Sequence, residues 1–294
     1  MNVVQIFRVS DSSSIMARLK MKNHLVIFML MAVGASSPLH AQSSKKSFIV
    51  TQTMSYKGGV DVSEFGVLRS PIIYEASLLP SKVSDQMVEG GELKDLIDGV
   101  KIGPVPLVID IERWPLYTNT ENERSKNREK LIKVLDSIRA VRPGIKLGYY
   151  SLVPARVYFP LIDQTKGVQK QMWKKSNDQA LDDFVSHVDA IFPSLYTLYD
   201  DQDGWEKYAE QTLQDARRFG KPVYCYLWPQ YHSSNQQLRG EYLSAKYWGL
   251  ELETCYKYAD GVVIWNHEPE KKWDPNVEWW QQTLKFLKSH SIKN

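Results

Sequence analysis

Two carboxylic side chains one residue apart, Asp110 and Glu112, form the pair in this sequence best suited to acid–base chemistry. They end an apolar run that begins at residue 105, and in an extended strand residues two apart point to the same face. Two neighbouring carboxyl groups cannot both ionise freely, and partial burial raises the pKa of one of them. The spacing predicts Glu112, nearer the open end of the strand, as a general acid and the deeper Asp110 as an orienting anion. The structural alternative is that the pair caps the next helix or bonds to Arg113.

The segments that must position this pair alternate between short apolar runs and longer stretches of helical periodicity. Strands are expected at residues 47–51, 71–79, 105–112, 145–152, 188–198, 222–228 and 261–265. Helices are expected near residues 84–98, 121–141, 169–186, 203–219, 240–258 and 276–289. Several runs are apolar on both faces, which is typical of parallel strands covered by helices.

This alternation predicts an α/β fold for residues 42–294, a single (β/α) TIM-type barrel domain, regular or distorted, with seven or eight strands. An open doubly wound sheet is the alternative. That fold usually carries a glycine-rich phosphate turn after an early strand, and this sequence has none.

Aromatic residues gather near the expected strand ends, where a barrel of this kind has its active site. Tyr196 follows the fifth run, and the others are Trp114, Tyr149, Trp228 and Trp265. Aromatic rings can stack on the apolar faces of sugar rings, although any one of them is more often core packing. Five at the same end favour a sugar-binding mouth, with a poly- or oligosaccharide as the substrate.

The order of these short motifs resembles the hyaluronidase family of glycoside hydrolases over residues 105–268. The motifs are Asp110-x-Glu112 with a following Trp, Gly148-Tyr149-Tyr150, Pro193-Ser194-Leu195-Tyr196 and Gly261-Val262-Val263-Ile264-Trp265. The resemblance implies a distorted (β/α) barrel that hydrolyses a bond next to an N-acetylhexosamine with retention of configuration. Chitinase-like families share the D-x-E motif and are the second choice, because their longer acidic series is absent before Asp110.

The resemblance also implies roles for individual residues. Glu112 would act first as the acid and then as the base, while the acetamido oxygen of the substrate attacks the anomeric carbon. Asp110 and Tyr196 would orient and polarise the acetamido group, and Trp265 would surround its methyl group. Two carboxylates on one strand approach a sugar from the same side, which suits a nucleophile supplied by the substrate.

Other functions remain open from the sequence. A conventional retaining glycosidase would use Glu112 as acid and Glu268 as nucleophile, and a non-catalytic barrel would bind a glycan without cleaving it. Metal-dependent hydrolysis is disfavoured because His232 and His267 lack metal-site spacing. No Gly-x-Ser-x-Gly motif supports a serine hydrolase, and nothing calls for a cofactor or a metal.

Composition and the N-terminal segment define the broad class. The 294 residues are 43% hydrophobic and 12% aromatic, and the net charge of +3 is spread along the chain, which disfavours nucleic acid as a partner. Residues 1–41 read as a signal peptide whose apolar core is too short for a stable membrane span, with the start at Met1, Met16 or Met21. We therefore expect a periplasmic or secreted protein. Composition indicates no oligomeric state, and Cys225 and Cys255 are compatible with a disulfide or with two buried thiols.

Overall fold

The computed structural model describes residues 47–292, so the expected signal peptide at residues 1–41 lies outside the described residues. Within this part the strands pair in parallel and form two sheets. The first sheet has the order β2 (Leu68–Arg69), β1 (Ile49–Lys57), β7 (Gly261–Lys272) and β6 (Tyr224–Leu227). The second has the order β3 (Ile72–Tyr74), β4 (Leu107–Asp110) and β5 (Leu147–Tyr149). The architecture is therefore α/β with parallel sheets, as the alternating pattern predicts.

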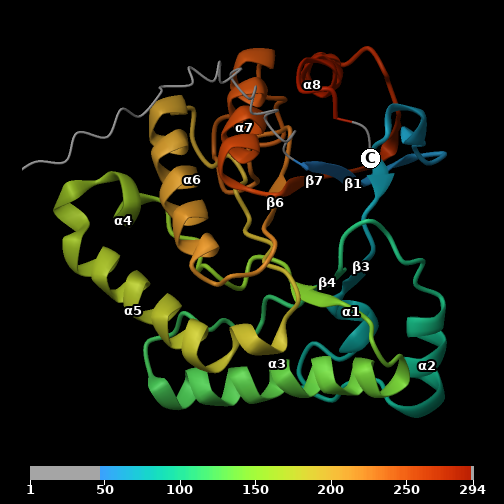
Figure 1. Ribbon diagram of the computed structural model, residues 1–294, viewed down its shortest axis with the longest axis vertical. Helices are drawn as coiled ribbons and strands as arrows, with labels where there is room; N and C mark the ends of the chain where they lie inside the picture. Colours follow the sequence, from blue (N-terminus) through green and yellow to red (C-terminus); the bar gives the residue numbers. More distant parts are fainter. Residues whose placement is uncertain (1–46, 293–294) are drawn as a thin grey trace, which may run out of the picture. The chain divides into compact units, whose positions relative to one another are not determined.

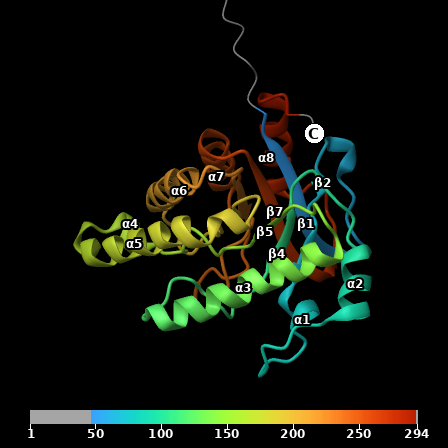
Figure 2. The same cartoon turned by 60° about the horizontal axis from the view of Figure 1, so that its bottom comes forward.

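The longest strand pair, β1 with β7, runs through the centre of the first sheet and is visible side by side in Figure 2. Its register begins with Ile49 opposite Gly261 and extends to Lys57 opposite Lys272. The last strand is therefore longer than the expected run at 261–265. Glu268 lies in this extension, opposite Tyr56 of β1.

The two sheets follow each other around a ring, but the ring is not closed by a continuous ladder. Between β5 and β6, residues 191–194 form only isolated bridges, such as Tyr150 with Phe192 and Ser194 with Tyr226. On the other side, β2 bonds to β1 and the next segment, β3, bonds to β4. Residues 47–292 contain seven strands, but the expectation of a closed barrel is corrected here. The barrel is open because residues 191–194 pair with their neighbours only over single residues and β2 does not pair with β3.

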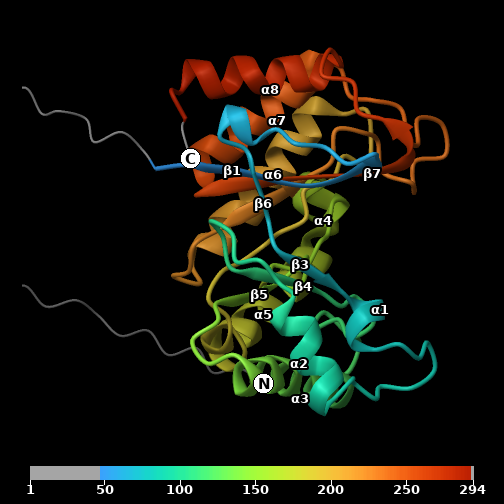
Figure 3. The ribbon, with the colours of Figure 1, turned by 90° about the vertical axis from the view of Figure 1, so that its right-hand side faces the viewer.

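Helices cover the outside of the strands (Figures 1 and 3). The longer ones are α2 (Gly90–Asp98), α3 (Glu121–Val141), α5 (Gly167–Asp183), α6 (Gln202–Arg217), α7 (Ala245–Tyr258) and α8 (Glu278–Ser289). Single-turn helices α1 (Glu75–Leu78) and α4 (Phe159–Ile162) follow β3 and the loop after β5. All six expected helices are present, although α2 and α7 begin later than expected.

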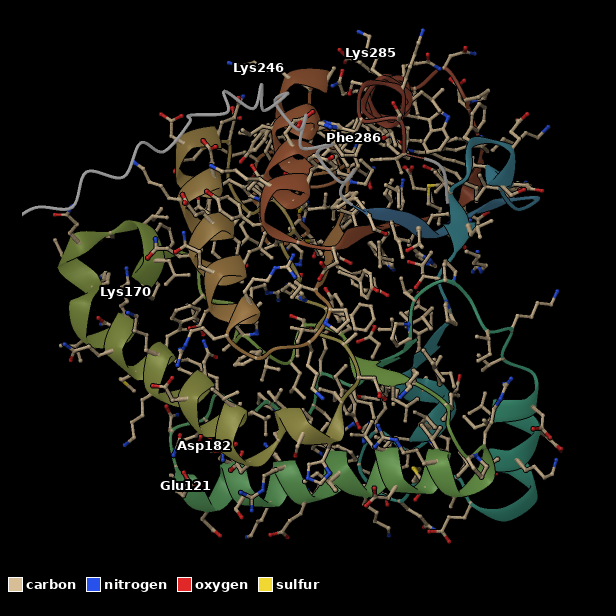
Figure 4. The ribbon with its side chains drawn as sticks, in the orientation of Figure 1. Glu121, Lys170, Asp182, Lys246, Lys285 and Phe286 are labelled. Atoms are coloured by element: carbon tan, nitrogen blue, oxygen red, sulfur yellow. The ribbon has the colours of Figure 1, made fainter. Side chains whose placement is uncertain are left out.

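Side-chain caps and amphipathic faces explain where these helices lie. The Thr120 hydroxyl accepts the backbone N–H of Glu123 at 3.2 Å and so begins α3, and the Asp201 carboxylate does the same for α6. Figure 4 shows charged side chains such as Lys246 and Lys285 on the outer helices, and both are exposed. The next residue after Lys285, Phe286, is 2% exposed and packs toward the core. Each helix thus buries one face against the strands.

The interior of the strand ring is filled largely by aromatic side chains. This inner cluster contains Val105, Val108, Tyr150, Ala190, Phe192, Tyr196, Tyr224, Tyr226 and Val263. Gly148 makes room for it, because a Cβ there would lie 2.5 Å from the Phe192 ring. Below the candidate site the ring is therefore a packed core, and the cavity described next lies at its C-terminal end.

Candidate active site

A cavity of about 220 Å³ opens at the C-terminal ends of β3, β4 and β6, beside the middle of β7. Its lining consists of carboxylates, aromatic rings and two basic side chains, namely Ile72, Tyr74, Asp110, Glu112, Tyr150, Arg156, Tyr196, Tyr226, Trp228, His232, Ser233 and Trp265. Five of the seven site residues expected from the sequence line it together: Asp110, Glu112, Tyr196, Trp228 and Trp265. We call this cavity the central pocket.

Asp110 and Glu112 provide the only carboxylates among the residues lining the central pocket. Asp110 ends β4 and is half-buried, whereas Glu112 is exposed. Within residues 47–292, no hydrogen bond or ion pair engages either carboxyl group. Both are therefore free to act on a bound molecule.

Burial raises the pKa of Asp110 to about 7, and the negative charges of Glu112 and Glu75 add to the shift. The sequence predicts the proton on Glu112 and the anion on Asp110. The raised pKa belongs to Asp110, which is the more buried of the two. Asp110 therefore holds its proton at pH values where an ordinary aspartate is ionised.

Tyr196 lies beneath the mouth of the central pocket, 6% exposed, with its ring centroid 6.0 Å from that of Tyr150. Burial raises the pKa of Tyr196 well above its ordinary value, and Tyr150 and Asp110 add to this. The phenol is therefore a neutral hydrogen-bond donor at any physiological pH.

Trp228 and Trp265 form an aromatic corner of the pocket, with ring centroids 4.8 Å apart and planes at 89°. Trp265 also stacks on Tyr196 at 5.7 Å. The Trp228 indole N–H donates to Gln230 Oε1 at 2.8 Å, which fixes its ring. Such a corner can enclose a small apolar group and the C–H face of a sugar.

Trp114 and Tyr149, expected as substrate contacts, do not line the central pocket. The Trp114 indole is buried, donates to Asp85 at 3.0 Å and lies under Lys130. The Tyr149 hydroxyl donates to the Leu131 carbonyl at 2.8 Å in the outer layer under α3. Both residues belong to the packing between strands and helices, and the alternation of side chains along β5 turns Tyr150 inward instead of Tyr149.

Several lining residues were missed from the sequence: Tyr74, Tyr150, Tyr226, Arg156 and His232. Strict alternation from Gly148 would have identified Tyr150, and the same argument applies to Tyr226 in β6. Arg156 and His232 come from irregular loops after strands, for which the sequence holds no periodic signal. Tyr226 is 1% exposed, and its hydroxyl has no hydrogen-bond partner among the described residues.

Arg156 is one of four arginines in residues 47–292 that form no ion pair, and it is the one that lines the central pocket. Six others form ion pairs with carboxylates: Arg113, Arg124, Arg128, Arg139, Arg217 and Arg218. The half-buried Arg156 makes only a long hydrogen bond, 3.4 Å, to Ser194 Oγ. Its guanidinium group therefore brings an unpaired positive charge to the pocket.

His232 contributes a neutral ring beside this arginine. Burial lowers the pKa of His232, and the charge of Arg156 lowers it further. The Ser234 backbone N–H donates to Nδ1 at 3.1 Å, which assigns the ring proton to Nε2. His232 can therefore offer a hydrogen bond from Nε2 to a bound molecule.

A second cavity of about 200 Å³ shares Glu112, Tyr150 and Arg156 with the central pocket. Its other walls include Pro115 and Tyr117 from the loop after β4. Glu112 thus lies between two cavities, where it can reach a bond that joins groups bound on either side.

Glu268 lies outside the lining of the central pocket and is occupied by other side chains. Its carboxylate accepts hydrogen bonds from Tyr242 and Lys271, from Asn266 at 3.1 Å and from Gln230 at 3.3 Å. Partial burial acts to raise the pKa of Glu268, but the bonds from Lys271, Tyr242 and Asn266 outweigh it and hold the pKa below its ordinary value. Glu268 is therefore a bound anion that supports Gln230.

Three further observations concern the cysteines, metal binding and membrane-spanning helices. Cys225 is a buried free thiol in β6, and Cys255 is buried in α7. In the described part of the chain, no group of three or more acidic, histidine or cysteine side chains could hold a metal ion. None of the helices in residues 47–292 is long and apolar enough to cross a membrane.

Comparison with solved structures identifies the fold. Bee venom hyaluronidase matches with a TM-score of 0.56 at 17% identity, covering 82% of this chain and 97% of that one. The same enzyme in complex with a hyaluronic acid tetramer matches with a TM-score of 0.53 at 16% identity, covering 83% and 97%. No protein-family model matches the sequence, and no curated protein does. The chain has a hyaluronidase-like fold, in agreement with the resemblance of its motifs.

Proposed function

We propose that this chain is a glycoside hydrolase that cleaves next to an N-acetylhexosamine with assistance from the acetamido group of the substrate. One observation carries the proposal: the central pocket is lined by two carboxyl groups that lie two residues apart at the end of β4, and by no other carboxylate. A conventional retaining glycosidase needs two carboxyl groups about 5–5.5 Å apart on opposite sides of the bond. A nucleophile that belongs to the substrate removes this need.

The proposed first step breaks the glycosidic bond. Glu112 donates its proton to the leaving oxygen while the acetamido oxygen bonds to the anomeric carbon, which gives a cyclic intermediate. Asp110 accepts the acetamido N–H, and the neutral phenol of Tyr196 polarises the group. Trp265 encloses the methyl group in the corner that it forms with Trp228.

In the second step water attacks the anomeric carbon, and the Glu112 carboxylate accepts its proton. The cyclic intermediate opens and the acetamido group is restored, so the configuration is retained. The second cavity beside Glu112 supports this scheme, because it offers room for the sugar on the other side of the broken bond.

We also propose that the glycan is acidic. Arg156 has no carboxylate partner among the described residues, and His232 can donate from Nε2. A carboxylate on the glycan would satisfy both groups. The bee enzyme is held in complex with a hyaluronic acid tetramer, and this makes hyaluronic acid the first glycan to test. Such a substrate fits export to the periplasm or the medium, which the N-terminal pattern supports.

The test is a product-release assay on acetamido-containing polysaccharides beside glucans and mannans. It compares the wild type, Glu112→Gln and Glu92→Gln, whose exposed carboxylate on α2 serves as the matched control. We expect cleavage of acetamido glycans only, with loss in Glu112→Gln alone. Cleavage of non-acetylated glycans would contradict the assisted mechanism. Tight binding of a glycan that stays intact would instead favour a non-catalytic binding protein.

A further inference from the structure

Glu251 on α7 is a fully buried carboxyl group that the proposed mechanism does not use. It is 0% exposed, and the only other buried carboxylic residue in the described chain, Asp215, is ion-paired with Arg218. In residues 47–292, Glu251 has no cation beside it. One oxygen, Oε1, accepts a hydrogen bond from the Thr197 hydroxyl, and the other, Oε2, has no partner there. An uncompensated charge at such a site is costly.

The partner of Glu251 connects two walls of the central pocket. Thr197 directly follows Tyr196, and its backbone carbonyl accepts the backbone N–H of His232 at 2.8 Å. Tyr196 and His232 both line the pocket, and their ring centroids are 6.2 Å apart. Thr197 itself is 0% exposed, so its hydroxyl depends on Glu251 for a partner.

We propose that Glu251 is a positioning residue for the central pocket, which it controls through Thr197 by fixing Tyr196 relative to His232. The catalytic part of this inference rests on the proposed function, because it assumes that Tyr196 acts on the substrate. The geometric part does not, since it concerns the position of His232 in the protein alone.

The protonated form of the carboxyl group is the one that fits this site. Burial raises the pKa of Glu251 well above its ordinary value of 4.5, and the Thr197 bond lowers it only in part. The titratable groups facing Glu251 are Tyr247 on its own helix and Tyr231 in the segment before His232. Both are phenols, and the charges that act on them are carboxylates: Asp200 and Glu241 on Tyr231, and Asp201 on Tyr247. None of these groups would stabilise an ionised Glu251.

The experiment compares four variants by NMR titration of the His232 ring, by steady-state kinetics and by thermal unfolding. Glu251→Gln keeps a neutral group with an acceptor oxygen, whereas Glu251→Leu and Thr197→Val remove the hydrogen bond. Thr283→Val is the matched control, because it removes another buried bond of α7, from the Trp248 indole at 2.8 Å, that does not lead to the pocket.

We expect Glu251→Leu and Thr197→Val to shift the His232 titration and to lower kcat by about tenfold, the effect of one lost hydrogen bond. Glu251→Gln should retain the wild-type titration and kcat. Thr283→Val should lower the unfolding temperature without changing either. Equal losses of stability in all three disruptive variants, with His232 unchanged, would overturn the inference. A wild type that cleaves no glycan, while His232 responds as expected, would refute the proposed function and leave the positioning role intact.

Discussion

Two strands of different sheets, β4 and β7, each have a glutamate at or just after their C-terminal part, and the surroundings of the two glutamates differ completely. Glu112 after β4 is exposed and unbonded among the described residues, between two cavities. The Glu268 side chain on β7 is 8% exposed and accepts four hydrogen bonds. The two glutamates therefore differ in what they can do. A carboxyl group without hydrogen-bond partners can exchange a proton with a bound molecule, whereas one that already accepts four hydrogen bonds cannot do so readily.

The carboxyl pKa values near the ends of β4 and β7 are shifted in opposite directions. Bonds from Lys271, Tyr242 and Asn266 hold the pKa of Glu268 low despite its partial burial. At β4, burial and neighbouring carboxylates raise the pKa of Asp110 to about 7. A raised carboxyl pKa beside an unpaired glutamate is the condition for acid–base work near neutral pH.

The different roles of the two glutamates can be tested by neutralising each side chain in turn. Glu112→Gln should lower kcat by about 10²–10⁴-fold, because it removes the proton donor while the fold is kept. Glu268→Gln should not approach this loss. Trapping of a glycosyl group on Glu268, or a wild-type rate for Glu112→Gln, would reverse the assignment of the two strands.

A second test concerns the tyrosine that faces the carboxyl pair. Tyr196→Phe should lower kcat by about 10²-fold with little change in KM, since its hydroxyl acts on the attacking group in the transition state. Tyr149→Phe is the matched control, because its hydroxyl donates to Leu131 outside the pocket. It should cost about 1 kcal/mol of stability and leave kcat unchanged. A similar fall of kcat in both variants would contradict the separate roles of the two tyrosines.

The supporting role of Glu268 predicts a smaller effect on binding. Gln230 bonds both Glu268 and the Trp228 indole, so Glu268→Gln should loosen the aromatic corner. We expect KM to rise by about threefold with kcat nearly constant, the signature of weakened binding alone. Trp228→Phe should show the same pattern in the same assay. A fall in kcat without a change in KM would place Glu268 in the chemistry.

A further prediction concerns the pH dependence of the stability of the fold. The folded protein holds the Asp110 proton up to a pKa of about 7, whereas the ordinary value is 3.8. Between these values the unfolded chain releases a proton that the folded chain keeps, so this group's contribution to stability falls as the pH rises.

Asp110→Asn should remove this trend. Its unfolding temperature relative to the wild type should increase by several degrees between pH 4 and pH 7 and then stay level. Glu92→Gln, which changes an exposed carboxylate, should show no such trend in the same thermal scans. A parallel pH dependence in Asp110→Asn and the wild type would mean that Asp110 carries no raised pKa.

Much of the fold was predictable because the periodic patterns are strong. The expected helix at 121–141 matches α3 at both ends, and the run at 105–112 contains β4. The errors occur where local pattern competes with tertiary context. The expected strand at 188–198 forms only isolated bridges, since its neighbours pair with it over single residues. The helix expected from residue 84 begins at Gly90. The backbone carbonyls of Ser81 and Ser84, in the segment before it, accept hydrogen bonds from Arg113 instead.

The sequence by itself determined the α/β alternation, the closeness of Asp110 and Glu112 at the end of a strand and the aromatic residues near strand ends. These features depend on backbone periodicity, which is local. The tertiary structure alone decided that the barrel is open, that Tyr150 faces the pocket while Tyr149 faces α3, and that Arg156 and Glu112 have no charged partner within residues 47–292. Such properties depend on which distant side chains meet, because hydrogen bonding, burial and charge pairing are set by neighbours that the chain brings together only when it folds.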